Sequence, residues 1–82
     1  MVEQQVRTIL RDTLHLGESA ARLNPASGLL GVLAELDSMA VITVITAMED
    51  QFGFVVDDDE ISAETFATFG SLVQFVESKV NA

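Results

Sequence analysis

The sequence contains no cysteine, one histidine and four basic residues against thirteen acidic ones. Without cysteine, the chain can form neither a disulfide bond nor a thiolate metal site. The single histidine, His15, would need a neighbouring serine inside a sheltered cleft to take part in nucleophilic catalysis, and a chain of 82 residues offers little room for such a cleft. We therefore expect no catalytic residues and favour a surface or partly packed position for His15.

Long apolar runs and an excess of basic residues are missing as well. The longest apolar stretch, Met39 to Met48, is too short to span a bilayer, and the opening MVEQQ lacks the basic start and apolar run of a secretory signal. The formal net charge of −9 disfavours binding to nucleic acid or anionic lipid and favours basic protein surfaces as partners. These absences predict a cytoplasmic protein without stable membrane insertion.

The sequence does have apolar material for one small core. The hydrophobic fraction is 49% and charged residues make up 21%, a composition that is too apolar for a disordered acidic tail. At this length one domain is the ceiling, and such a domain buries roughly 60–65% of the surface that its unfolded chain exposes. We expect a single helical domain over residues 1–82 that is a monomer.

Apolar residues recur at helical spacing in several parts of the chain. The spacing predicts a first helix over about Val2–Leu16, stopped by Gly17. A second helix is predicted to begin at Asp37 or Ser38, two strong N-cap residues, and to end at Gly53. At about 100° per residue, its core face is Val41, Val44, Ile45, Met48 and Phe52, and its outer face is Met39, Thr43, Thr46 and Asp50.

Two further helices are expected near the end of the chain. With Ser62 as N-cap, Ile61 and Phe66 hold the two positions of a hydrophobic staple and indicate a short third helix. The last helix is expected to start at Thr68 or Ser71. Its predicted core positions are Phe69, Leu72, Val73, Val76 and Val80.

The connection between the first two helices, residues 17–36, is rich in turn residues and is the part least suited to regular structure. Five leucines recur through it and are expected to pin it onto the core: Leu23, Leu29, Leu30, Leu33 and Leu36. The predicted fold class is therefore all-α, a four-helix bundle with a short third helix and a long first loop.

An acidic run at residues 57–60 invites a calcium-binding interpretation, which its spacing contradicts. If Asp57 were loop position one, Ser62 would stand where a glycine is needed and Thr68 where a bidentate glutamate is needed. We interpret the run as a solvated acidic turn and expect no metal site.

The most informative stretch is Glu35-Leu36-Asp37-Ser38-Met39. Its simplest interpretation is an ordinary helix start capped by Asp37 or Ser38. A functional interpretation needs a serine hydroxyl that points outward at a helix N-terminus. Such a hydroxyl is open to a modifying enzyme, and a phosphodiester formed on it would lie beside the positive end of the helix dipole. In that case Asp37 is the cap and Ser38 is the first helical residue.

Leu36-Asp37-Ser38-Met39 resembles the attachment motif of the acyl carrier protein family, in which Asp and Ser precede Leu or Met. The acidic helix end over 49–53 and the closing segments 59–61 and 66–72 also resemble the family's pattern. Matching length, strong acidity and an apolar-pinned first loop accompany these motifs, so the resemblance covers nearly the whole chain.

The resemblance implies that a phosphopantetheinyl transferase, with its own Mg²⁺, transfers 4′-phosphopantetheine from coenzyme A to Ser38, beside Asp37. The terminal thiol of this covalent cofactor would hold acyl groups as thioesters for enzymes of fatty acid, polyketide or related biosynthesis. The resemblance favours an acyl carrier over a peptidyl carrier, whose motif usually has a Gly-rich lead-in, and leaves a D-alanyl carrier open. The alternative from a different class is a small helical adaptor without a cofactor, in which Ser38 is only a helix cap.

The sequence departs from the family in the first turns after Ser38, where typical members of fatty acid synthesis carry acidic residues. Here residues 39–43 contain no acid. We expect partners to recognise Met39 and nearby apolar surface more than early-helix charge. The residues predicted to contact acyl-loading and acyl-processing enzymes with basic docking patches are Glu35, Met39, Ile42, Glu49 and Asp50.

Overall fold

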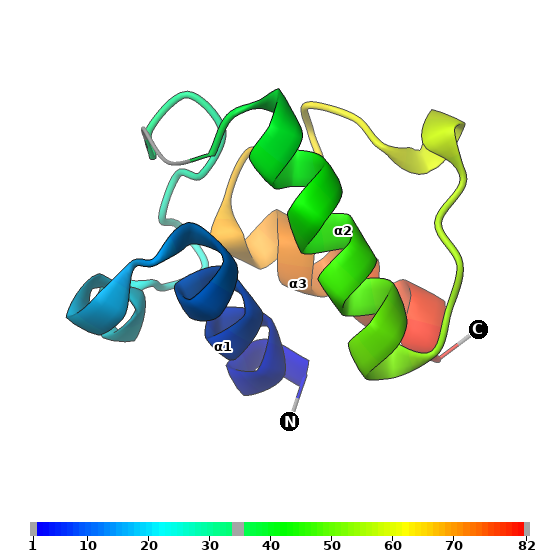
Figure 1. Ribbon diagram of the computed structural model, residues 1–82, viewed down its shortest axis with the longest axis horizontal. Coiled ribbons are helices and arrows are strands. Elements are labelled where there is room, and N and C mark those ends of the chain that lie inside the picture. The colour runs from blue at the N-terminus through cyan, green and yellow to red at the C-terminus, as the bar shows by residue number, and fades with distance from the viewer. Residues whose placement is uncertain (1, 34–35, 82) are drawn as a thin grey trace.

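The computed structural model describes residues 2–33 and 36–81, which form helices and connecting loops (Figure 1). The described residues contain three α-helices: α1 (Val2–Leu14), α2 (Ser38–Phe52) and α3 (Phe69–Val80). Two short 3-10 helices lie in the connections: η1 (Gly17–Arg22) and η2 (Asp58–Glu60). The all-α bundle with a long first connection is confirmed, and its short helical element in the second connection is η2, which lies before Ser62 and not after it as predicted. No helix within the described ranges is long and apolar enough to cross a membrane.

The core is apolar throughout the described residues. α1 packs against both α2 and α3, and buried side chains come from all three helices, with Leu10, Met48 and Phe69 among the largest. The predicted inward face of α2 is confirmed, since Val44 and Met48 are fully buried. The prediction for Val80 is wrong, because Val80 is the last residue of α3 and its side chain is 42% exposed.

α1 ends two residues earlier than its apolar pattern predicts. His15 adopts a left-handed backbone conformation with φ 55°, and the N–H of Leu16 donates to the carbonyl of Arg11 at 3.0 Å. This hydrogen bond closes the last turn in the manner of a Schellman motif, in which a left-handed residue follows the helix. His15, rather than the predicted Gly17, therefore stops α1, and its side chain is exposed as expected.

The first connection contains more regular structure than its turn-rich composition predicts, because η1 forms a 3-10 helix over Gly17–Arg22. The guanidinium of Arg7 donates to the carbonyls of Ala20 and Leu23, both at 2.7 Å, and lies 5.0 Å from the centre of the Phe69 ring. η1 is therefore attached to α1 by an arginine that also contacts the core. This long-range contact has no local signal in the sequence.

The predicted anchoring of the first connection by leucines is confirmed in most positions. Leu23, Leu29 and Leu36 are buried and Leu33 packs partly against the core. Leu30 is the exception at 40% exposure. Its side chain lies at the surface near the start of α2, where it becomes part of the site described below.

The rest of the first connection is hydrogen-bonded to the start of α3. The N–H groups of Phe69 and Gly70 donate to the carbonyls of Ser27 and Pro25 at 2.8 and 3.0 Å. These are first-turn N–H groups that have no partner inside their own helix. Thr68 completes the helix start as the N-cap predicted for it, with a capping box to Ser71.

The segment after Ser62 forms turns over 63–67 instead of the expected helix. The Ser62 hydroxyl does accept the N–H of Thr65 at 3.3 Å, as an N-cap would. The carbonyls of Phe66 and Ala67, however, accept N–H groups of the first connection at 2.9 and 3.0 Å. The strong local cap is thus overridden by a pairing between two loops that are distant in the sequence.

Candidate functional site

The start of α2 presents Ser38 to solvent. Asp37 is the N-cap residue, and its Oδ1 accepts the N–H of Ala40 at 2.8 Å. Ser38 is therefore the first helical residue and is exposed. The prediction that Asp37 is the N-cap and Ser38 the first helical residue is confirmed. The Ser38 hydroxyl is therefore not needed to cap the helix.

This end of α2 suits an anionic ester. In an α-helix the N–H groups of the first residues, here Ser38 and Met39, have no carbonyl partner inside the helix. Together with the helix dipole they favour a negative charge at this end. A phosphodiester on the Ser38 oxygen would lie beside these donors, so the donor set fits 4′-phosphopantetheine.

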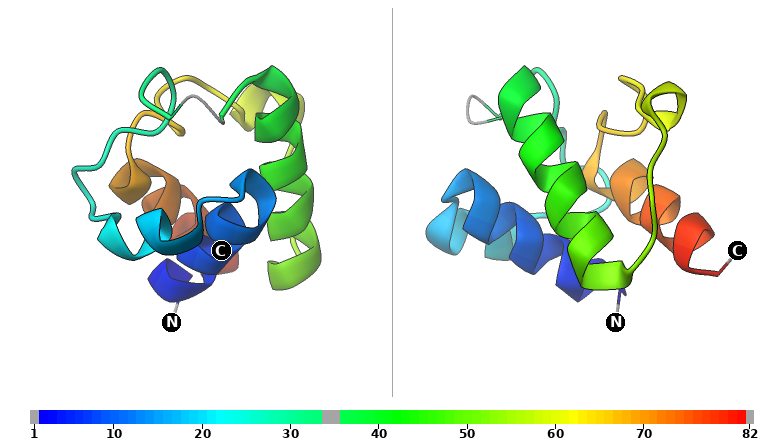
Figure 2. Two further views of the ribbon diagram at one scale, coloured as in Figure 1. Left: turned by 60° about the vertical axis from the view of Figure 1, so that its left-hand side comes forward. Right: turned by 45° about the vertical axis from the view of Figure 1, so that its right-hand side comes forward.

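An apolar groove of about 400 Å³ includes Ser38 in its lining. It runs between the start of α2 and the segment that precedes α3, and Figures 1 and 2 show these parts gathered at one end of the molecule. Its lining is almost entirely apolar apart from two serines: Leu30, Ser38, Val41, Ile42, Ile61, Ser62, Ala63 and Phe66. A flexible chain attached to Ser38 therefore has an apolar surface within reach.

Sequence reasoning missed this groove. Leu30 was expected in the core, and Ile61 and Phe66 were expected to staple a helix, yet all three line the groove. The N–H of Leu30 donates to the carbonyl of Phe66 at 2.9 Å, which brings the two side chains to one place. The apolar character of the three residues was visible in the sequence, but their meeting depends on this long-range pairing.

Two large exposed apolar side chains lie on the first turns of α2. Ile42, which lines the groove, is 58% exposed, and Met39, which follows Ser38 in α2, is 71% exposed. The first turn of α2 contains no acidic residue. Two of the predicted partner contacts, Met39 and Ile42, therefore lie near Ser38 on the first turns of α2, which carry no acidic side chain after the cap Asp37.

The other predicted partner contacts lie elsewhere. Glu49 and Asp50 are near the far end of α2, about 17–18 Å from Ser38 along the helix axis. Asp50 is exposed, whereas Glu49 is half-buried and its carboxylate accepts the N–H of Val56 at 2.8 Å. Glu49 thus holds the chain that leaves α2. Glu35 lies outside the described residues.

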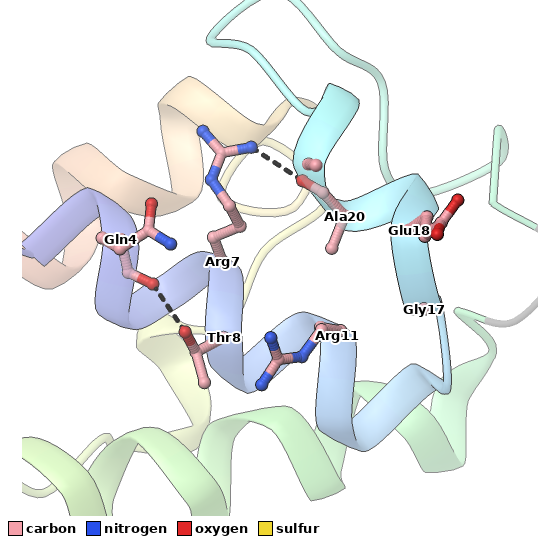
Figure 3. A pocket seen from close by; sticks show the side chains of 8 residues that line it. Gln4, Arg7, Thr8, Arg11, Gly17, Glu18 and Ala20 are labelled. Carbon is pink, nitrogen blue, oxygen red and sulfur yellow. Dashed lines mark hydrogen bonds between the residues drawn. The ribbon is translucent and has the colours of Figure 1, made fainter.

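A second hollow, of about 370 Å³, lies between α1 and η1 (Figure 3). Arg7 and Arg11 line it, so it is the more basic of the two sites. The Arg7 guanidinium is occupied by the Ala20 carbonyl, as the dashed line shows, and the exposed guanidinium of Arg11 pairs with Asp12 at 3.1 Å. Because both arginines have partners within the protein, we interpret this hollow as part of the fold.

Comparison with known proteins agrees with this geometry. A family model described as "Phosphopantetheine attachment site" matches residues 4–76. An acyl carrier protein from Nitratidesulfovibrio vulgaris is 32% identical over 78 residues, which cover 95% of this chain and 96% of that protein. An acyl carrier protein from Sinorhizobium fredii is 29% identical over 76 residues, which cover 93% of this chain and 91% of that protein.

A solved structure is also similar to this chain. The solution NMR structure of a holo acyl carrier protein from Nitrosomonas europaea has a TM-score of 0.89 and 58% sequence identity, and the match covers 99% of this chain and 96% of that chain. The chain belongs to the phosphopantetheine attachment family. Within this class it is an acyl carrier protein, a carrier of acyl groups and not a catalyst, with covalently bound 4′-phosphopantetheine as its cofactor. The alternative of an adaptor without a cofactor is not supported.

Proposed function

We propose that Ser38 is the residue that carries 4′-phosphopantetheine. One observation supports this above all: Asp37 caps α2 through its own carboxylate, so the Ser38 hydroxyl is exposed at the first helical position. In the transfer, the Ser38 oxygen forms a bond to phosphorus as the phosphoanhydride bond of coenzyme A breaks, and the nucleotide half departs. The hydroxyl proton goes to a base of the transferase. When bound, the group supplies a thiol on a flexible arm that holds acyl groups as thioesters.

Asp37 and the first turn of α2 then help to position the phosphodiester that the transfer forms on Ser38. Asp37 fixes the helix start through Ala40, which leaves the N–H groups of Ser38 and Met39 directed at the new phosphodiester. The helix dipole favours the negative charge of the ester. The attachment point is therefore held rigidly while the arm beyond it remains free to move.

We also propose that the apolar groove shelters the acyl chain between partner enzymes. Its lining offers Leu30, Ile42 and Ile61 to an alkyl chain and includes the proposed attachment residue. Removal of an alkyl chain from water gains about 0.8 kcal/mol per buried CH₂ group. The cargo that fits this groove is an alkyl chain of the kind made in fatty acid, polyketide or related biosynthesis.

The partner enzymes are expected to contact two different surfaces. A phosphopantetheinyl transferase and acyl-processing enzymes would touch Met39 and Ile42 beside Ser38, where the surface is apolar and adaptable. The basic patches of these enzymes would contact Asp50 at the far end of α2. Glu35, which precedes α2 in the sequence, is the other acidic residue expected to contact them. Glu49 is a weaker candidate, because its carboxylate already accepts a hydrogen bond from the backbone of Val56.

The attachment proposal is tested by intact mass after incubation with coenzyme A, Mg²⁺ and a broad phosphopantetheinyl transferase. We expect the natural chain to gain the mass of one phosphopantetheine and Ser38→Ala to gain none. Ser62→Ala is the matched control, because Ser62 lies on the same groove and is also exposed. It should be modified like the natural chain. A mass gain in Ser38→Ala, or none in the natural chain, would overturn the proposal.

The partner proposal is tested by the rate of the same transfer. We expect Met39→Ala to lower kcat/KM by about five-fold or more, the loss typical of an apolar contact residue worth roughly 1 kcal/mol. Val55→Ala is the control, because Val55 is 73% exposed but lies beyond the far end of α2. Equal rates for Met39→Ala and the natural chain would contradict a role for this surface.

A further inference from the structure

The wall of the groove opposite α2 is the segment 61–66. Its end is fixed by hydrogen bonds to two other elements. The carbonyl of Phe66 accepts the N–H of Leu30 at 2.9 Å, and the carbonyl of Thr65 accepts the Ser71 hydroxyl at 2.9 Å. The position of this end is therefore set by backbone carbonyls bound to the first connection and to α3.

The beginning of the wall is fixed differently. Lys79, in the last turn of α3, donates to both carboxylate oxygens of Glu60 at 2.8 and 3.0 Å. The two side chains are only 23% and 30% exposed, so water screens the pair less than it screens an open surface pair. Ile61, which lines the groove, follows Glu60 directly in the chain. The backbone position of Ile61 is therefore linked directly to that of Glu60.

Ile61 also packs partly against the core, but the chain around this ion pair has few other polar contacts after the bond from the Val56 N–H to Glu49 of α2. Ser62 bonds only locally, to Thr65, and the carboxylate of Glu60 also accepts the N–H of Asp57 within the same loop at 3.3 Å. Among the described residues, the Glu60–Lys79 pair is the polar contact that ties 57–64 to a helix. Lys79 is the only lysine in the chain, so no neighbouring lysine can replace it.

We propose that Glu60 and Lys79 are positioning residues for the cargo, because their ion pair holds Ile61 against the groove and so sets how well an acyl chain on Ser38 is shielded from solvent. The inference rests on the proposed function of Ser38 and of the groove. Glu60 and Lys79 do not line the groove themselves. They affect it through Ile61, the lining residue that follows Glu60 in the chain. A segment with one such side-chain tie opens locally more easily than one held by several backbone bonds.

The test compares thioester cleavage by hydroxylamine in proteins loaded with an octanoyl or an acetyl group. Loading is first checked by intact mass. We expect Lys79→Gln and Glu60→Gln to speed cleavage of the octanoyl thioester about three-fold or more, because a looser wall shields the chain less. Cleavage of the acetyl thioester should not change, since so short a group gains little from the groove.

Two controls separate positioning from general stability. Arg11→Gln breaks an exposed ion pair with Asp12 on α1, away from the groove, and should leave both cleavage rates unchanged. The exchanged double variant, Glu60→Lys with Lys79→Glu, rebuilds the pair with opposite orientation and should restore octanoyl shielding. If the single variants act through a general loss of stability and not through the position of Ile61, octanoyl cleavage in the double variant should be as fast as in the single variants.

The outcomes of the inference and of the proposed function are distinct. If the proteins load at Ser38 and octanoyl cleavage is the same in Lys79→Gln as in the natural chain, the positioning role is overturned while the attachment stands. If the natural chain does not load, both are overturned. Should a single variant fold poorly, the double variant decides, because faster octanoyl cleavage there despite a restored melting temperature contradicts the proposal.

Discussion

The two connecting segments of this molecule both supply a wall to the groove beside Ser38, yet they are held in different ways. The segment between α1 and α2 brings Leu30, and it is fixed by a fully buried Leu29 and by backbone bonds to the start of α3. The segment between α2 and α3 brings Ile61, and it is fixed at that end by the Glu60–Lys79 ion pair. The first segment is thus anchored by a core leucine and by backbone bonds, whereas the second is anchored at its beginning by the partial packing of Ile61 and by an ion pair between two side chains.

The sharpest test of this difference is to truncate one apolar residue in each segment. Leu29→Ala should lower the free energy of unfolding by about 2–5 kcal/mol, because a fully buried leucine leaves a cavity. Ile61→Ala should cost roughly 1 kcal/mol, because Ile61 is only half-buried. Urea unfolding of both variants gives the comparison. Equal losses would mean that the two segments are equally integrated in the core.

A second test concerns the close approach of the first connection to α3. A Cβ at Gly70 would lie 2.7 Å from the backbone oxygen of Pro25, which cannot move without breaking the loop pairing. Gly70→Ala should therefore destabilise the protein by roughly 1–3 kcal/mol. In an open helix the same change would stabilise by about 1 kcal/mol, so the sign is diagnostic.

The control for this variant is Gln74→Ala, at an exposed position of the same helix. Its unfolding free energy should stay within about 0.5 kcal/mol of the natural chain. If Gly70→Ala has the same unfolding free energy as this control, the first connection can move to accommodate the new methyl group. The first connection would then not be rigidly fixed against α3.

The smallest expected effect is a pH dependence in the second segment. The hydrogen bond from Lys79, helped by the N–H of Asp57, holds the pKa of Glu60 below its ordinary value of 4.5. Because the folded-state pKa is the lower one, this carboxylate stabilises the fold above pH 4.5, and its contribution is lost as the pH falls through the lowered pKa.

Thermal melting across pH 2–8 checks the effect through Glu60→Gln. The melting temperature of the natural chain should exceed that of Glu60→Gln at neutral pH, and the gap should close at acidic pH. Asp12→Asn, which removes the exposed pair on α1, should show a smaller gap at every pH. A gap for Glu60→Gln that persists to the lowest pH would contradict an ionic tie.

Much of the fold and the local geometry of the candidate site were predictable because the signals are local. Asp37, Ser38 and Gly53 mark the two ends of α2 through side-chain capping and a left-handed glycine, with φ 76° at Gly53. Thr68 marks the start of α3 in the same way. Each of these depends on residues within one helical turn, so the sequence alone carries the information.

The rest depends on contacts between distant parts of the chain. The carbonyls of Phe66 and Ala67 bond to the first connection, which turns a predicted helix into a set of turns and creates the groove. Arg7 similarly attaches η1 to α1. The half-burial of Glu49 follows from its bond to the Val56 N–H and not from its position in the acidic helix end. None of these pairings has a short-range pattern.

The central claim is that a chain attached at Ser38 enters the groove between the two connecting segments. The most direct measurement is NMR of the apo, holo and octanoyl forms, with the methyl shifts of Leu30, Ile42 and Ile61 followed. We predict that these methyl groups shift strongly on octanoyl loading and much less on conversion from apo to holo. Shifts confined to residues next to Ser38, or centred on Ile9 and Ala47 between α1 and α2, would contradict it.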